Sequence, residues 1–219
     1  MLHPCYDSTP HIILPMKKVE LILVLFAATS IAIHFQNILE TDALLIVSLS
    51  ALALYYYLFG FLLFNKIELK NIFRKMTYKG LTLKCILGSV ILGITISGIL
   101  TGMLTKLRML SDGNAQFVGS LMLMISVMLT ATYYYLRRRY DFLQRAWKRA
   151  FVYGGIGILT YLTPFSTLID VYYHSYPEYA ELKKEVMKDP SNRALRDKLE
   201  AKANEIWYED AQNQMWVGK

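Results

Sequence analysis

The chain has 219 residues, of which 54% are hydrophobic, and its formal net charge is +7. The apolar residues form long blocks without charge, which argues against a soluble domain, and the basic residues lie between these blocks. This distribution is typical of a membrane protein and excludes nucleic-acid binding as the reason for the positive charge. The two cysteines, Cys5 and Cys85, have neither a metal-site spacing nor a disulfide framework.

Residues 1–15 contain three prolines and no periodicity, so we expect a disordered extension and a natural start at Met16. The first apolar segment, Val19–Gln36, follows two lysines and is predicted to be a retained membrane helix. A basic start and an apolar middle also describe a cleavable signal peptide, which is the alternative. The second segment, Ala43–Phe64, is joined to the first by a short acidic turn.

Residues 65–84 hold six basic residues and one glutamate, with apolar residues spaced for one helical face. This pattern predicts a short amphipathic helix that lies on anionic lipid headgroups. The lipid bilayer is therefore the first expected partner.

The third segment, Cys85–Thr105, has 21 residues without charge. That length crosses a hydrocarbon core of ~30 Å at ~1.5 Å per residue. Glycine costs about 1 kcal/mol relative to alanine in a soluble helix, but in a membrane helix small residues let another backbone approach closely. We therefore predict that four glycines form a helix-packing face: Gly88, Gly93, Gly98 and Gly102.

The fourth segment, Phe117–Leu136, ends in three tyrosines before a basic cluster, a pattern of the cytoplasmic interface. Residues Arg137–Arg149 are expected to form a second interfacial basic helix. The fifth segment, Phe151–Ile169, has 19 uncharged residues and Pro164. It is just long enough to span, and a kinked or re-entrant helix is the alternative because proline interrupts a helix.

The tail, residues 171–219, has a soluble composition and is predicted to be helical. Pro177 opens a helix that runs to about Lys188, and Asp189 and Pro190 have the sequence of an N-cap and first position of another. The second tail helix has an apolar stripe of Leu195, Leu199, Ala203 and Ile206. This stripe is expected to pack against the first tail helix, the membrane surface or another protein.

Charge predicts the orientation of these segments. Fourteen Lys and Arg lie on the side where the odd segments start, and only Lys106 and Arg108 lie in the loops of the other side. The positive-inside rule therefore places the N-terminus in the cytoplasm of an inner-membrane protein. If the fifth segment spans, the tail lies outside, in the periplasm of a Gram-negative cell.

Motifs for catalysis, metal binding or phosphate binding do not occur in the sequence, so we expect no enzyme and no cofactor. Ionisable residues inside a membrane are functional candidates, and His34 and Asp170 lie near segment ends. A hydrogen-bonded His34 and a boundary role for Asp170 are the simpler interpretations. Ser97 and Thr101 fit helix packing, or they line a narrow pore in an oligomer. Glu20, near the start of the first segment, is expected to reach the interface.

The run IHFQNILETDALLIVSLSALALYYYLFGFLLF has a histidine near the end of one helix, a tight turn and an aromatic-rich second helix. In these features it resembles the small helical hairpins of Bacteroidetes inner-membrane proteins, such as the gliding and secretion motor subunit GldL. The His-Trp-Pro-Gly turn of that group is replaced here by His34-Phe35-Gln36-Asn37, and neither function nor site residues are transferred from the resemblance.

The sequence thus predicts an all-α polytopic membrane bundle with four spans, a fifth that is just long enough to span, and a soluble helical tail. The function that fits best is a non-enzymatic scaffold or a subunit of a membrane complex, with a homo-oligomer or another membrane protein as partner. The alternative is an oligomeric pore, transport component or membrane effector with a path lined by serine and threonine.

Overall fold

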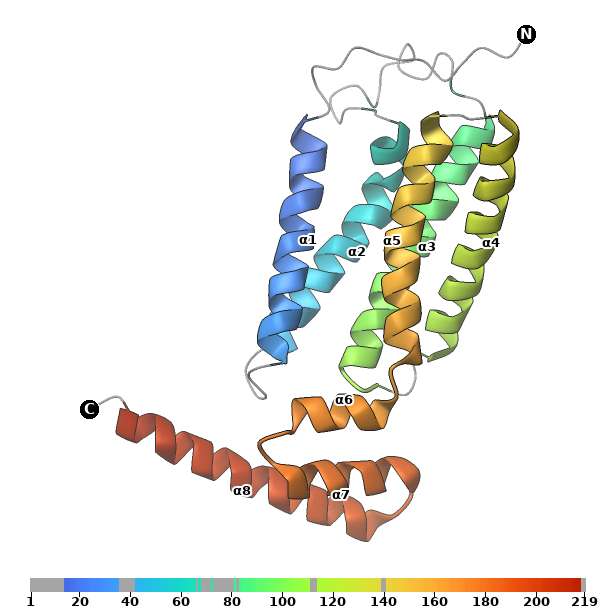
Figure 1. Cartoon of the computed structure of the whole chain (residues 1–219). Coiled ribbons are helices and arrows are strands. Elements are labelled where there is room, and N and C mark those ends of the chain that lie inside the picture. Colours follow the sequence, from blue (N-terminus) through green and yellow to red (C-terminus); the bar gives the residue numbers. More distant parts are fainter. Residues whose placement is uncertain are drawn as a thin grey trace. The chain divides into compact units, whose positions relative to one another are not determined.

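The structure is a computed structural model that describes residues 14–35, 42–65, 67, 72, 81, 83–110, 114–138 and 141–217. These residues form helices and, among them, no strand (Figure 1). The helices are α1 (Leu14–His34), α2 (Asp42–Asn65), α3 (Leu83–Leu107), α4 (Asn114–Arg138), α5 (Asp141–Leu162), α6 (Phe165–Tyr172), α7 (Pro177–Lys188) and α8 (Arg193–Val217). The all-helical prediction is confirmed for this part of the chain.

The chain divides into two compact units, Met1–Leu162 and Thr163–Lys219, whereas the sequence placed the boundary after Asp170. In the first unit, α1 to α5 run side by side, with α2 between α1 and α3, and with α5 against α3 and α4 (Figure 1). Because successive helices alternate in direction, α1, α3 and α5 begin at the end of the bundle where α2 and α4 finish. In the second unit, α7 packs against both α6 and α8.

Three described helices are long and apolar enough to cross a membrane. They cover Asp42–Asn65, Cys85–Leu107 and Ala115–Tyr133. The interrupted pair Ala146–Leu162 and Phe165–Tyr172 raises the number to four if both helices belong to one span. The predicted count of four spans and a fifth is not confirmed, because α1 is not in this set. Lys17, Lys18 and Glu20 all lie in the first turns of α1.

Pro164 accounts for the interruption after α5. It precedes α6 with φ −64° and ψ 149°, an extended conformation, and it has no N–H with which to continue the helical ladder. The predicted segment Phe151–Ile169 is therefore two helices, as the kinked alternative describes. A separate basic helix over Arg137–Arg149 does not form, because α4 ends at Arg138 and α5 is continuous from Asp141.

The tail helices differ from prediction at one cap. The α8 helix starts at Arg193, and the Leu195 N–H donates to Asn192 Oδ1 at 3.3 Å, so Asn192 and not Asp189 is the capping residue. Asp189 instead accepts a hydrogen bond from Ser191 Oγ at 2.6 Å in the turn after α7. Ile206 of the apolar stripe is buried and α7 packs against α8, so the first tail helix is a partner of the second. Most of the predicted extension, residues 1–15, and most of the predicted amphipathic helix at 65–84 lie outside the described residues. Leu14 and Pro15 belong to α1 and not to the extension.

Candidate functional site

Glu20 on α1 is held by side chains from two other helices. Arg149 on α5 donates from Nε to Oε1 at 2.8 Å and from Nη2 to Oε2 at 2.7 Å. The hydroxyl of Tyr56 on α2 donates to Oε1 at 2.5 Å. The Glu20 and Arg149 side chains are 14% and 21% exposed. The sequence predicts that Glu20 reaches the membrane interface. In the structure its carboxylate is instead held inside the bundle by hydrogen bonds from α2 and α5.

A second tyrosine extends this group. Because the single proton of the Tyr56 hydroxyl is donated to Glu20, the Tyr153 hydroxyl 3.0 Å away donates to the Tyr56 oxygen. The two rings meet edge to face with centroids 5.1 Å apart. We name Glu20, Tyr56, Arg149 and Tyr153 the α1 clamp. Beside it, Tyr55 donates to the Met16 carbonyl at 2.8 Å, which fixes the first turn of α1.

In the α1 clamp, the opposite charges of Glu20 and Arg149 are paired with each other. A bidentate arginine–carboxylate pair is a strong charge-assisted contact, and an unpaired charge in a low-dielectric interior is costly. The guanidinium of Arg149 also lies 5.5 Å from the centre of the Phe64 ring on α2. These contacts favour a fixed structural role for the pair over repeated gain and loss of a proton. Among the described residues, His, Cys, Asp and Glu form no group of three or more that could hold a metal ion.

Lys106 is a second basic residue in the interior, although the sequence placed it in a loop. Its side chain is buried on α3, its ammonium donates to the Tyr161 carbonyl on α5, and it lies 5.2 Å from the centre of the Tyr161 ring. The last carbonyls of a helix have no partner within the helix. Lys106 therefore stabilises the end of α5, just before the interruption at Pro164.

Three of the four predicted packing glycines lie at close contacts within the chain. A Cβ at Gly93 would lie 2.8 Å from the Tyr56 carbonyl oxygen on α2, next to Gly60. A Cβ at Gly98 would meet Ser120 Oγ at 2.3 Å, and one at Gly102 would meet the Phe117 ring at 2.4 Å. Gly88 is half-buried near the start of α3. The glycine face of α3 thus contacts α2 and α4 of the same chain.

The predicted polar candidates are not brought together. His34 is buried at the end of α1, with Nδ1 3.5 Å from Asp42 Oδ1 at the start of α2. Asp170 lies on α6 with a side chain that is 56% exposed, and its carboxylate is 2.5 Å from Lys184 Nζ on α7. These two residues belong to different units of the fold.

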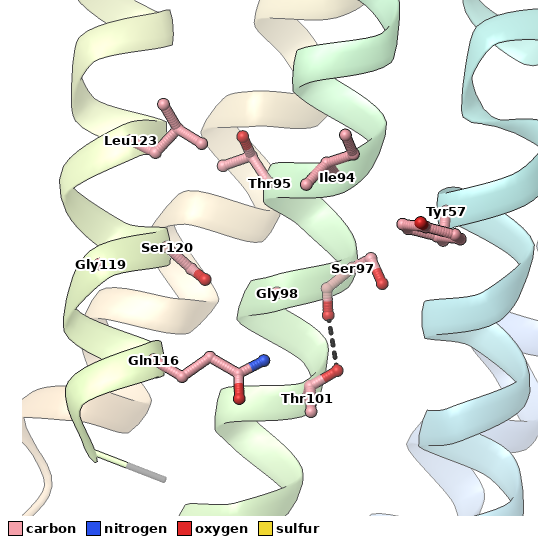
Figure 2. A pocket seen from close by; sticks show the side chains of 10 residues that line it. All are labelled: Tyr57, Ile94, Thr95, Ser97, Gly98, Thr101, Gln116, Gly119, Ser120 and Leu123. Atoms are coloured by element: carbon pink, nitrogen blue, oxygen red, sulfur yellow. Dashed lines mark hydrogen bonds between the residues drawn. The ribbon is translucent and has the colours of Figure 1, made fainter.

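Ser97 and Thr101 line a pocket of about 390 Å³ formed by α2, α3 and α4 (Figure 2). Within α3, Thr101 Oγ1 donates to the Ser97 carbonyl at 2.9 Å. Ser120 and Gln116 point from α4 towards α3, and Tyr57 points from α2 towards Ser97 (Figure 2). Both this pocket and the α1 clamp bring together polar side chains from three helices.

Sequence reasoning missed the α1 clamp because its partners are far apart in the chain. One signal was present: Glu20 and Arg149 are opposite charges at corresponding depths, each just at the start of an apolar segment. Two such segments that begin at the same end of a bundle can bring these charges together.

Comparison of the chain with protein-family models, with curated proteins and with solved structures gives no match.

Proposed function

We propose that this chain is a multi-pass inner-membrane protein that acts as a non-enzymatic scaffold or as a subunit of a membrane complex. The observation that carries the proposal is the α1 clamp, in which Glu20 accepts two hydrogen bonds from Arg149 and one from Tyr56. A proton or ion carrier needs an intramembrane ionisable group that exchanges its partner. Here the Glu20–Arg149 pair has no net charge, and three hydrogen bonds hold the Glu20 carboxylate in place. Such a pair favours a structural role in a bundle that does not change conformation.

The same contacts support five membrane segments. Lys17 and Lys18 are exposed at the start of α1, where long basic side chains reach the headgroups. Glu20 is neutralised by Arg149, so α1 crosses the membrane with its charges either paired or at the interface. The excess of basic residues on one side then gives a cytoplasmic N-terminus and a tail outside.

The outer faces of the bundle provide surfaces for partners. Large apolar side chains are exposed on α1, as at Leu21 and Leu25, and on α4, as at Met122 and Leu129. In a membrane these faces contact lipid or the helices of a neighbour, whereas the glycine contacts of α3 are already used inside the chain. A partner, either a second copy or another membrane protein, would pack on such exposed apolar faces, which α2 and α5 also present.

The alternative is an oligomeric pore, transport component or membrane effector. One observation favours it: the pocket places Ser97, Ser120 and Gln116 on one side of the bundle, where copies could enclose a polar path. Against it, the hydroxyls of Thr95 and Thr101 already donate to carbonyls of their own helix, at 2.7 and 2.9 Å.

The experiment is purification of the complex from the native host in mild detergent, with its mass and its co-purifying proteins determined. The proposal expects a complex of fixed stoichiometry that contains a different membrane protein or a defined homo-oligomer without conductance. A homo-oligomer that conducts ions in planar bilayers would favour the alternative.

A further inference from the structure

We propose that the pocket between α2, α3 and α4 binds a neutral membrane lipid that carries hydroxyl or ester groups. Its volume of about 390 Å³ lies within the range of small-molecule sites, about 300–1,000 Å³. The inference goes beyond the scaffold proposal, because a lipid site needs only that the bundle lies in a membrane.

The chemistry of the lining selects a neutral headgroup. Lys, Arg, Asp and Glu are absent from the described residues that line the pocket, and the polar groups are hydroxyls and one amide. Within the described residues, no hydrogen bond is made by the side chains of Ser97, Ser120 or Gln116. An unpaired polar group that faces hydrocarbon is unfavourable, so these groups favour a ligand with hydroxyl or carbonyl oxygens.

The lining combines polar and apolar groups along its depth, and Ser97 lies about 15 Å from the end of α3 at ~1.5 Å per residue. Gln116 lies about 3 Å from the start of α4, and Thr101 lies about 9 Å from the end of α3, at ~1.5 Å per residue. These two helix ends meet at the same end of the bundle (Figure 1). Leu123 and Ile94 lie deeper, about 14 and 20 Å from those ends. A headgroup near Gln116, an ester or hydroxyl oxygen near Ser97 and an acyl chain along Leu123 and Ile94 would fit this lining.

One glycine makes the pocket testable. Gly119 lines the pocket, and a Cβ built there has no neighbouring atom within 4 Å, so a side chain can be added at this position and a leucine would take up space in the pocket. Gly155 on α5 has equally open space and does not line the pocket. Gly155→Leu is therefore the matched control for Gly119→Leu.

The test uses the purified full chain in nanodiscs that contain a trace of diacylglycerol with a diazirine in its acyl chain. After irradiation, mass spectrometry locates the label. We expect it to concentrate on α3 and α4 around the pocket. Gly119→Leu should lower this labelling about tenfold, which corresponds to about 1.4 kcal/mol of binding free energy. Gly155→Leu should leave it unchanged.

A second arm replaces the probe by phosphatidylglycerol with the same diazirine, which should label the pocket less because neither Lys nor Arg is among the described residues that line it. Ser120→Ala combined with Gln116→Met removes polar groups without added bulk, and it should reduce labelling by diacylglycerol even if Gly119→Leu fails to fold. Labelling that is uniform over the lipid-facing helices, or equal for both probes, would overturn the proposal. Loss of a co-purifying protein in Gly119→Leu with lipid labelling intact would show instead that the pocket receives a partner helix.

Discussion

The carboxylate of Glu20 and the guanidinium of Arg149 form a two-point contact, at 2.8 and 2.7 Å, between the first and the fifth helix of the bundle. In the chain these residues are 129 positions apart. The contact holds α1 against the rest of the bundle, although α1 carries three charged residues near its start. It has the geometry that a charged pair needs in order to remain in an apolar surrounding.

Removal of one partner should destabilise the bundle strongly. Glu20→Gln leaves the partly buried Arg149 with a weaker acceptor. Since the loss of one member of a fully buried pair costs about 3–5 kcal/mol, we expect a loss near the lower end of this range. The thermal unfolding of the detergent-solubilised protein measures this. Lys148→Gln is the control, since Lys148 is the exposed neighbour of Arg149.

The double variant Glu20→Gln/Arg149→Gln should lose less stability than the two single variants lose in sum, because it leaves neither charge unpaired. Equal stability of Glu20→Gln and Lys148→Gln would refute the clamp.

Tyr56→Phe should weaken the clamp without changing charge. It removes the donor to Glu20 and the acceptor of Tyr153, and a buried group left without its hydrogen bond costs about 1–3 kcal/mol. The adjacent Tyr57 is 60% exposed and provides the control Tyr57→Phe. Unfolding in a denaturing detergent would compare the two; a larger loss for Tyr57→Phe contradicts the assignment.

Gly93→Ala should separate α2 from α3. Its Cβ would lie 2.8 Å from the backbone oxygen of Tyr56, which cannot rotate away as a side chain can. Overpacking of this kind costs about 1–3 kcal/mol. Gly155→Ala meets open space and should change the stability by less than about 1 kcal/mol. If both variants unfold at the same temperature, the close approach of Gly93 and Gly60 does not stabilise the bundle.

Lys106→Met should loosen the last turn of α5. The Tyr161 carbonyl loses its donor, and because this hydrogen bond is only partly buried we expect a loss of about 1 kcal/mol. Hydrogen exchange at the amides of residues 159–162 should become faster, with the rest of α5 unchanged. Arg108→Met removes a charge of the same sign from an exposed position nearby and should leave that exchange as it is.

Local patterns predicted much of the fold. Charge-free runs located α2, α3 and α4 to within a few residues, because a membrane helix must be apolar along its length. Pro164 marked the break after α5, since a missing N–H is a local property. The prediction of Asp189 as the N-cap of α8 was wrong, because Asp189 and Asn192 both suit an N-cap and the local sequence does not distinguish them.

Contacts between helices that are far apart in the chain could not be predicted from local sequence patterns. Gly60 was not predicted as a packing residue, since its role depends on Gly93 opposite it. Glu20 and Lys106 each look like interface charges until their partners on α5 are known. The hydroxyls of Ser97 and Thr101 were singled out, but the pocket that they line also needs α2 and α4.

The central claim is that α1 crosses the membrane as part of one bundle, held by Glu20 and Arg149. Single cysteines at Lys17→Cys, Asn37→Cys and Lys70→Cys, in a chain with Cys5→Ser and Cys85→Ser, test it with an impermeant maleimide on intact cells. Lys17 is exposed at the start of α1. We expect labelling at 37 from outside, and labelling at 17 and 70 only after permeabilisation. Labelling at 17 and 37 from the same side of the membrane would show that α1 does not cross, and would contradict the claim.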